Sequence, residues 1–508
     1  MIKNHNIQVC DPAGYKYSLT TSLLIKMLKK NKVSCIETSK LDKRSRIILF
    51  TFRSPWPNFY WALQKMRDAN IPVLSKDRTK DDPLIICGGI AMLNTLPFKN
   101  FFDAAWIGDA TRDMFKLIAN INERENFNKK QIINDLDKNG FLVPTVGKCI
   151  IPIHIKRSYS MFAHVLSLDR GLLINRWWNK RLSSKAVLQI EIKRGCGRGC
   201  SFCVDHNKPS SGIKAKMLAD IVTNVLERYK NLYLVRLSFS TLNEMDLLKY
   251  INIVQKVKGS HNAQFRIDIG STVPDEFSYE VACKIKEIGQ NSMVFAPEVA
   301  QGLIDGVDLR RENKKWFTDE ILFKAINNGV KAGLSELTLY HLTGFPGETF
   351  NHLKAYVTLV KKIVSNFSKL KKIIISSGPL FATVGTKLEN VSQITFKEAK
   401  RRWLYFSRLL KNEKKVNVLW WLNIQKNKLV PYESNPEISF LRAYFYRGIE
   451  EMGNVLLRLV NKYPNRGDYL KINVNELEKI MLEEGIDTSD IFNFRDTIKR
   501  IKLNRIYH

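Results

Sequence analysis

The sequence predicts an α/β protein that consists of an N-terminal Rossmann-like domain, a partial (βα)6 TIM-type barrel and a helical C-terminal cap. Short β-rich runs alternate with helical patterns in the first 125 residues, six regular strand-helix units follow from residue 186, and the pattern is mainly helical beyond about 426. Such alternation is typical of parallel sheets covered by helices. We expect the first domain at 1–125, a linker at 126–184, the barrel at 185–425 and the helical domain at 426–508.

The first domain is predicted from four strand-like runs and the helical patterns between them. The runs are IQVC, RIILFTF at 46–52, PLIICGG at 83–89 and AAWIG at 104–108, and helical patterns cover 17–30 and 57–69. Strands that are buried on both faces give nearly continuous apolar runs of this kind. We therefore expect a parallel sheet with helices on both faces.

The second region repeats one unit, a strand followed by a helical stretch. Its strands are expected near 187–193, 232–239, 264–269, 292–296, 336–342 and 372–376. Six such units joined by right-handed crossovers would curl into three quarters of an eight-stranded barrel. The working face of such a barrel lies at the carboxyl ends of its strands.

Composition bounds the class of protein. The chain has 508 residues, of which 44% are hydrophobic and 26% charged, so it is neither a small module nor a disordered chain. We expect no membrane span and a cytoplasmic protein, because no apolar run reaches the roughly 18 residues of a span and the N-terminal residues lack the apolar core of a signal peptide. Eight cysteines are too few for a disulfide scaffold.

The net charge of +32 favours a polyanionic partner. Its lysines are spread along the chain among Ile and Asn, a pattern that AT-rich coding also produces. The strongest local candidate is an expected helix at 395–415, although a solvated helix face is the preferred explanation for it. Nucleic acid therefore stays an open partner, behind a small molecule or a peptide.

Three cysteines cluster directly after the first barrel strand, in RGCGRGCSFC. Cys196, Cys200 and Cys203 have the spacing CxxxCxxC. Three thiolates on one tight loop can hold three irons of a 4Fe-4S cluster and leave the fourth iron open to a small molecule. Glycines at 195, 197 and 199 let the backbone wrap closely around such a cluster. A Cys3His zinc site completed by His206 and inert core cysteines are the alternatives.

This motif resembles that of the radical S-adenosylmethionine (SAM) superfamily. The resemblance implies that the open iron chelates the amino and carboxylate groups of SAM, which one electron cleaves to methionine and a 5′-deoxyadenosyl radical. An external electron donor such as flavodoxin or ferredoxin is then a partner. Phe202 matches the aromatic position expected to lie near the adenine.

The resemblance implies further SAM contacts at residues that occupy the positions of SAM-binding residues in other members of the superfamily. Ser240 and Thr241 end the second strand, where many members have a Gly-Gly-Glu run, and Ser271 follows the third strand. Glu298 leaves the fourth strand, where its carboxylate would accept hydrogen bonds from ribose hydroxyls. An ordinary strand-end cap for Ser271, and a salt bridge from Glu298 to a basic residue at 310, 311 or 314, are the structural alternatives.

Two further stretches resemble the cobalamin-binding, class B-type radical SAM subgroup. They are MVFAPEVA and LTLYHLTGFPGET, in which Glu348 and Thr349 are expected to cap the next helix. The first domain resembles the cobalamin-binding domain of that subgroup, with Gly88 and Gly89 close to the corrin or its tail. The His-containing loop that supplies a cobalt ligand in some cobalamin proteins is absent, since the first strand runs into CDPAGYKYS.

The resemblance implies methylation of an unactivated carbon in a peptide or a small molecule. One SAM would methylate cob(I)alamin and a second, cleaved at the cluster, would abstract a substrate hydrogen. Cyclisation or rearrangement without cobalamin is an alternative outcome. A further alternative is a reaction like that of the tRNA methylthiotransferases, which would require a second cluster on Cys10, Cys35 and Cys87. A zinc-stabilised protein that binds nucleic acid is the non-enzymatic alternative.

Overall fold

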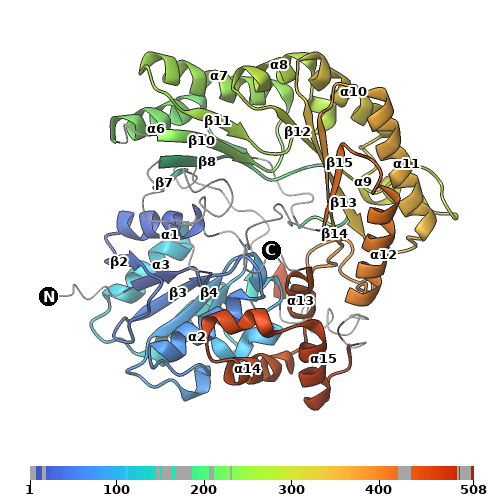
Figure 1. The fold of residues 1–508 in the computed structure, drawn as a ribbon. Helices are drawn as coiled ribbons and strands as arrows, with labels where there is room; N and C mark the ends of the chain where they lie inside the picture. Colours follow the sequence, from blue (N-terminus) through green and yellow to red (C-terminus); the bar gives the residue numbers. More distant parts are fainter. Residues whose placement is uncertain are drawn as a thin grey trace.

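The fold was analysed in a computed structural model. The structure describes residues 7–13, 19–108, 110, 112–144, 149–151, 163–167, 186–204, 211–228, 232–420, 436–488, 491 and 505–507. Two groups of parallel strands, each flanked by helices, lie one above the other in Figure 1, and the last helices return to the first group. Among the described residues, no helix is long and apolar enough to cross a membrane.

The N-terminal strands form one parallel sheet in the order β2-β1-β3-β4-β5. They are β1 (Ile7–Cys10), β2 (Cys35–Glu37), β3 (Ile47–Thr51), β4 (Leu84–Gly88) and β5 (Ala104–Trp106). One face packs against α1 (Leu19–Lys30), α3 (Arg112–Glu123) and α4 (Lys129–Lys138) in a single buried cluster. The other face packs against α2 (Asn58–Asp68). The prediction of a parallel sheet covered on both faces is confirmed.

All six predicted strands of the barrel region are present and parallel. They are β8 (Ala186–Arg194), β10 (Leu232–Phe239), β11 (Arg266–Ile269), β12 (Ser292–Glu298), β13 (Glu336–Thr343) and β14 (Lys372–Pro379). Their hydrogen bonds form two sheets, β11-β10-β8-β7 and β12-β13-β14-β15. The added strands are β7 (Ala163–Ser167), antiparallel to β8, and β15 (Val416–Trp420), parallel to β14; the short β9 (Ser211–Gly212) also pairs with β8.

Helices cover the outer face of these strands because the strands alternate in burial. In β13, Leu337 and Leu339 are buried whereas Thr338 and Tyr340 are not. The buried positions pack against α6 (Ala215–Arg228), α7 (Glu244–Ser260), α8 (Tyr279–Glu287), α10 (Asp319–Lys331), α11 (Phe350–Asn366) and α12 (Phe396–Leu409). Most of these helices begin at a side-chain N-cap, as Thr318 does for α10 by accepting from Ile321 N.

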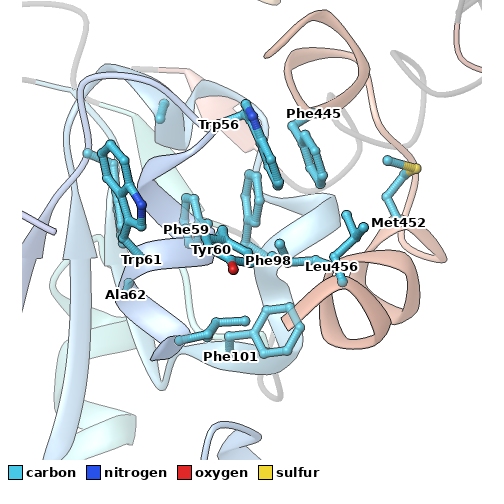
Figure 2. Packing of buried hydrophobic residues seen from close by; sticks show 14 of the residues in the cluster. Trp56, Phe59, Tyr60, Trp61, Ala62, Phe98, Phe101, Phe445, Met452 and Leu456 are labelled. Atoms are coloured by element: carbon cyan, nitrogen blue, oxygen red, sulfur yellow. The ribbon is translucent and has the colours of Figure 1, made fainter. Parts of the chain in front are cut away.

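The C-terminal helices pack on the N-terminal domain. Helices α13 (Pro436–Tyr446), α14 (Met452–Lys462) and α15 (Val474–Glu483) share one buried cluster with α2. Trp56 and Phe445 stack with ring centroids 5.3 Å apart, and Figure 2 shows them side by side. In addition, the short strands β6 (Cys149–Ile151) and β16 (Arg505–Tyr507) pair in parallel.

A buried arginine connects this cap to the barrel. Arg447 donates to the carbonyl oxygens of Ala382 and Val391, each at 2.8 Å, in the segment that follows β14. Burial lowers the pKa of Arg447 to about 9. The carbonyl groups therefore satisfy a guanidinium that is almost fully buried, and they hold α13 against the barrel.

Candidate functional site

The cysteine loop begins where β8 ends. Cys196, Cys200 and Cys203 are partly exposed, and Cys203 N donates to Cys200 O at 3.3 Å. Gly195 and Gly199 have φ angles of +87° and +72°, which L side chains rarely adopt. The backbone turns that bring the three cysteines onto one loop thus depend on these two glycines.

Two contacts anchor the loop to the segment that follows β12. Ser201 N donates to Asn313 O at 3.0 Å, and the Ser201 hydroxyl contacts the Asn313 side chain. The Arg198 guanidinium pairs with Asp275 and lies 4.5 Å from the ring of Trp316. Neither Asn313 nor Trp316 was predicted from the sequence. The one feature that could have pointed to them is their position after the stretch MVFAPEVA.

Glu298 ends β12 in a strained and buried position. Its φ is +65°, and the register of β12 against β13 slips between Phe295 and Glu298. A left-handed conformation costs a non-glycine residue about 1 kcal/mol or more, and such strain clusters at functional sites. Lys314 Nζ lies 3.5 Å from Glu298 Oε1 and donates to Ala296 O at 2.6 Å. Among the three basic residues considered, Lys314 makes the predicted salt bridge.

The electrostatics of this pair extend to the cysteine loop. Burial raises the pKa of Glu298, and the charge of Lys314 opposes the rise. Burial also raises the pKa of the Cys200 thiol, and the charge of Lys314 again opposes the rise. Lys314 is therefore a buried cation that favours both the carboxylate and the thiolate.

Phe202 lies between Lys314 and the turn after β13. The Lys314 ammonium is 5.8 Å from the centroid of the Phe202 ring, which meets the ring of Phe345 edge-on at 5.8 Å. Phe202 also packs against the small buried cluster that contains Val299 and Leu380. An apolar surface thus lies directly beside the cysteines.

The remaining predicted SAM residues lie at the same end of the strands. Ser240 follows β10, is exposed, and its N–H donates to Lys193 O at 3.3 Å. Thr241 is half-buried, and Ser271, which follows β11, is exposed. Because β8, β10 and β11 are parallel, these residues share one edge with the cysteine loop.

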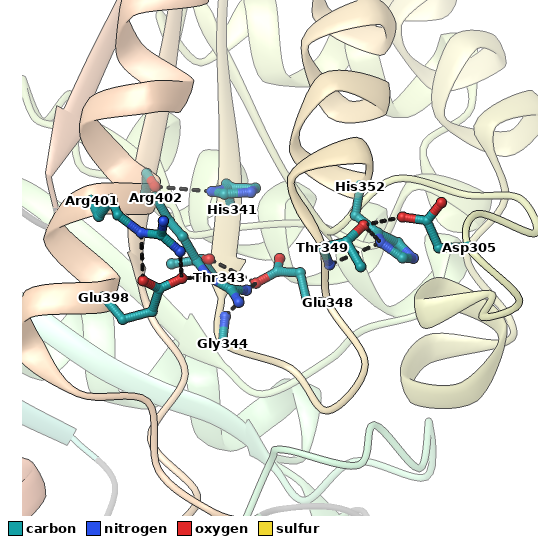
Figure 3. Close-up of polar contacts among 11 residues, drawn as sticks. Asp305, His341, Thr343, Gly344, Glu348, Thr349, His352, Glu398, Arg401 and Arg402 are labelled. Atoms are coloured by element: carbon teal, nitrogen blue, oxygen red, sulfur yellow. Dashed lines mark hydrogen bonds and ion pairs between the residues drawn. The ribbon is translucent and has the colours of Figure 1, made fainter.

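The turn after β13 is held by an internal hydrogen-bond network, drawn in Figure 3. The buried Glu348 carboxylate accepts from Thr343 Oγ1 at 2.7 Å, from Gly344 N at 2.6 Å and from Arg402 at 2.6 Å. Thr349 is the N-cap of α11, in a capping box with His352. Thr349 therefore caps the helix as expected, whereas Glu348 closes its own turn.

The donor set of the loop, three thiolates, matches the three protein ligands of a 4Fe-4S cluster that has one open iron. Among the described residues, no three His, Cys, Asp or Glu side chains converge to hold one ion. In a 4Fe-4S cluster each thiolate binds a different iron, so the three sulfurs need not meet at a single ion. His206, the ligand of the zinc alternative, lies outside the described residues.

Gly88 and Gly89 lie at the carboxyl end of β4. A Cβ at Gly89 would come within 2.3 Å of Phe52 O, and its φ is +107°. The close approach of the chain after β3 therefore requires a glycine at this position. Gly88 has no such crowding, since a Cβ there would meet its nearest atom at 3.7 Å.

Buried polar atoms that make no hydrogen bond to the described residues lie at the same edge of the N-terminal sheet. Asp11 follows β1, and Thr51 ends the adjacent β3. Within the described part of the chain, neither Asp11 Oδ2 nor Thr51 Oγ1 has a hydrogen-bond partner, and Arg53 Nε lies 4.0 Å from Asp11 Oδ2. The strand order reverses between β1 and β3, which is where open parallel sheets bind ligands. A ligand with hydrogen-bonding groups fits this edge.

Two family models match the chain, and their order follows the two groups of strands. Residues 17–144 match the model described as radical SAM proteins, N-terminal, and residues 190–360 match that of the radical SAM superfamily. The second match includes the three cysteines and Glu298. The chain belongs to the radical SAM superfamily. It is therefore a radical SAM enzyme, and its family implies a 4Fe-4S cluster and SAM as cofactors.

The chain is also similar to individual proteins. The chain is 23% identical over 349 residues to the uncharacterised protein MJ0966 of Methanocaldococcus jannaschii, covering 66% of this chain and 68% of that protein. Two structures of the radical SAM methyltransferase TsrM from Kitasatospora setae share its fold with a TM-score of 0.51. One, with cobalamin and a 4Fe-4S cluster bound, is 14% identical and covers 76% of this chain and 77% of its own. The other, with tryptophan and a SAM analogue bound, is 11% identical and covers 90% and 99%.

The N-terminal cysteines do not share a site. Cys10 and Cys87 belong to the cluster on the α2 face, whereas Cys35 belongs to the cluster on the opposite face of the sheet. Burial raises the pKa of Cys35 to about 11 and that of Cys87 well above its usual value. This arrangement gives no support to a second cluster on these cysteines.

Proposed function

We propose that this radical SAM enzyme is a cobalamin-dependent methyltransferase that acts on a carbon of a peptide or a small molecule. The observation that carries the proposal is that one chain has two candidate binding edges, one in each of its two groups of strands. A cysteine loop lies at the carboxyl ends of the barrel strands, and the preceding domain has a sheet edge where, within the described residues, the buried atoms Asp11 Oδ2 and Thr51 Oγ1 have no hydrogen-bond partner. The fold shared with TsrM, a methyltransferase crystallised with cobalamin, supports the same proposal.

Each side chain near the cysteines has a proposed role. We assign the cluster to Cys196, Cys200 and Cys203, and the adenine of SAM to the apolar surface at Phe202. When bound, the cluster and SAM supply a one-electron cleavage that yields methionine and a 5′-deoxyadenosyl radical. Burial raises the pKa of Glu298, and Lys314 opposes that rise and so favours the ionised form, in which the carboxylate would accept hydrogen bonds from ribose hydroxyls.

The polar groups of SAM are assigned to the ends of the neighbouring strands. Ser240, Thr241 and Ser271 lie at the edge that carries the cysteine loop, with Ser240 and Ser271 exposed. Their hydroxyls can donate to a carboxylate or accept from an ammonium group. The electron would come from an external donor such as flavodoxin or ferredoxin.

Cobalamin is assigned to the edge formed by β1, β3 and β4, next to Gly88 and Gly89. When bound, cobalamin supplies a methyl carrier. Among the described residues, Asp11 Oδ2 and Thr51 Oγ1 are buried there without a hydrogen bond, Asp11 Oδ2 having only the 4.0 Å ion pair with Arg53, and the amide groups of the corrin periphery are suitable donors. The chain offers no histidine in the loop that follows β1.

The cluster is tested by anaerobic reconstitution followed by iron and sulfide analysis and assay of 5′-deoxyadenosine. We expect four irons per chain and SAM cleavage, both lost in Cys200→Ala. Cys283→Ala is the matched control, because Cys283 is a partly exposed cysteine in α8, away from the loop. Retention of 5′-deoxyadenosine formation by Cys200→Ala would refute the assignment.

Cobalamin is tested separately, by incubating the protein with hydroxocobalamin and measuring bound cobalt after gel filtration. We expect one cobalt per chain and a clear loss in the double variant Asp11→Leu/Thr51→Val. The Cys200→Ala protein should still bind cobalt, since its N-terminal sheet is unaltered. Four irons without cobalt would overturn the methyltransferase proposal and leave a radical SAM enzyme of another outcome.

A further inference from the structure

A large share of the net positive charge lies in one segment of the barrel region. Residues 349–415 contain fifteen Lys and Arg against three Glu and no Asp, whereas the whole chain has 81 against 49. Between Thr349 and Leu388 there is no acidic residue. Coding bias spreads lysine evenly and does not remove acidic residues from one segment, so it does not explain this imbalance.

The structure brings this segment together as two neighbouring helices and the turns that follow them. Helices α11 and α12 pack side by side, through contacts such as Phe350 with Tyr405 at 4.8 Å (Figure 1). Lys415 Nζ donates to Ser368 O at 2.7 Å, which joins the two turns. We call the exposed cations of this region the α11–α12 basic face: Lys354, Lys361, Lys362, Lys369, Lys371, Lys372, Lys397, Lys400, Arg401, Arg408, Lys411 and Lys414.

Almost none of these charges is neutralised by the protein itself. Within the described part of the chain, Arg401, which binds Glu398, is the one member of the face that has an ion pair. Like charges held this close destabilise the folded chain through repulsion, a cost that a bound polyanion would remove. A partner outside the chain is therefore the natural source of the missing negative charge.

The composition of the face favours phosphate over a protein surface. Its exposed large apolar side chains are Leu404 and Leu409, and the other exposed side chains of the two helices are mostly lysine or small polar residues. Protein interfaces are depleted in lysine and rich in aromatic residues at their centre. Lysine binds phosphate as a mobile point charge, without the fixed geometry that a carboxylate surface requires.

The dimensions of the face suit a nucleic acid backbone. The 17 residues of α11 span about 25 Å at 1.5 Å per residue. On α12, Lys397, Arg401 and Arg408 recur at helical spacing, and Lys411 follows in the turn after the helix. At about 3.4 Å per phosphate along one strand of a duplex, a row of cations of this length runs past about seven phosphates, and we expect about five of them to be contacted.

We infer that the α11–α12 basic face binds the phosphate backbone of a nucleic acid. The face runs from the rim of the barrel, where Arg402 pairs with Glu348, to the opposite end of the strands, where Lys371 and Lys414 lie. A nucleic acid on this face would therefore extend along the outside of the barrel, with one end near the cysteine-bearing edge. The inference is independent of cobalamin and of the methyl transfer.

The test is fluorescence anisotropy of the full-length protein with labelled 24-nucleotide RNA, 24-base-pair RNA duplex and 24-base-pair DNA duplex, between 50 and 200 mM salt. For about five phosphate contacts, we expect affinity to fall about two orders of magnitude or more over this range. RNA and DNA arms distinguish the two sources of phosphate backbone. Binding that does not change with salt would overturn the inference.

The location is tested with two variants of equal charge. One replaces Lys362, Lys371, Lys411 and Lys414 with Gln, and the control replaces the exposed Lys214, Lys216, Lys249 and Lys256 on the α6–α7 side with Gln. We expect the first to lower affinity at least tenfold and to reduce the salt slope by 2 or more, and the control to stay within twofold. Equal losses in both variants would overturn the inference.

Competition decides the class of partner. Poly-glutamate and vesicles with half anionic lipid are offered in the same assay at equal negative charge. We expect nucleic acid to be retained against both. Displacement by poly-glutamate would assign the face to an acidic protein, and displacement by vesicles to a membrane surface; either result overturns the inference.

Discussion

Lys314 and Glu298 form a buried ion pair that connects the end of β12 to the cysteine loop. The two side chains are 8% and 10% exposed, and the Lys314 ammonium also donates to Ala296 O and faces the ring of Phe202. Because both charges are out of water, each depends on the other. One short helix, α9 (Leu309–Lys314), thus supplies the charge at the site and, through Asn313, the anchor of the loop.

Replacing Lys314 with Met should therefore destabilise the protein. The change leaves the Glu298 carboxylate buried without its cation, and we expect the free energy of unfolding to fall by about 3 kcal/mol at neutral pH. Lys315→Met is the control, since Lys315 is adjacent and exposed. Urea unfolding of the metal-free protein measures both. Equal stability of the two variants would show that Lys314 does not support Glu298.

His341 predicts how stability depends on pH. It is buried in β13, stacked on Phe406 at 4.5 Å, with Nδ1 2.9 Å from Ser377 Oγ. Burial lowers its pKa from 6.5 to about 3. Between these values the unfolded chain binds a proton that the folded chain does not, so stability falls as the pH drops below 6.5, by about 1.4 kcal/mol per unit.

We expect His341→Gln to lose this dependence, because glutamine does not titrate. Urea midpoints of wild type and variant at pH 7.5, 5.5 and 4.5 check it. The difference between the two proteins should shrink, or change sign, toward low pH. His261→Gln, at the exposed end of α7, should keep the slope of the wild type. A wild-type slope in His341→Gln would refute the assignment.

Four strands of the N-terminal sheet and six strands of the barrel region could be predicted from the sequence, because a buried parallel strand is a nearly continuous apolar run, whereas the short strands β2, β7 and β9 were not predicted. The segment β15 was not predicted, since VNVLW is short, follows four charged residues in KNEKK, and is only partly buried. The cap shows a second limit. Amphipathic spacing predicts helices in LRAYFYRGIEEMGNVLLRLV, but it does not say that their apolar faces meet Trp56, nearly 400 residues earlier in the chain.

In the candidate site, too, features set by local sequence could be predicted and features set by tertiary packing could not. The cysteine motif and the strand ends are local, so spacing alone locates Cys196, Cys200 and Cys203 on one loop. The choice of Lys314 as partner of Glu298 is not local, because it depends on how α9 turns. Arg310 faces Val299 O and Asp319 instead. A sequence contains three candidate cations there, and only the packing of α9 selects one.

Gly89 offers a test of the N-terminal edge. Gly89 has a φ of +107°, and the new Cβ of Gly89→Ala would clash with the backbone of Phe52; Gly108 has a φ of +108°, and no described residue lies within 4 Å of the Cβ that Gly108→Ala would add. Both variants carry the backbone strain of about 1 kcal/mol, but only the first adds a clash. We expect Gly89→Ala to lower the melting temperature clearly more than Gly108→Ala. Equal shifts of the melting temperature would mean that the backbone at Phe52, just after β3, can move to accommodate the new Cβ.

Phe445 tests whether the first and last parts of the chain unfold together. Its ring stacks on Trp56 and lies 6.1 Å from Phe98, inside the cluster of the N-terminal domain and α13–α15. Phe445→Ala leaves a cavity there, and we expect a loss of about 3 to 5 kcal/mol. Leu482→Ala, at a side chain that is 74% exposed, should cost less than 0.5 kcal/mol. If the cap folded independently of the N-terminal domain, thermal unfolding of Phe445→Ala would show a separate early transition; because one cluster joins both, we expect a single transition shifted to lower temperature.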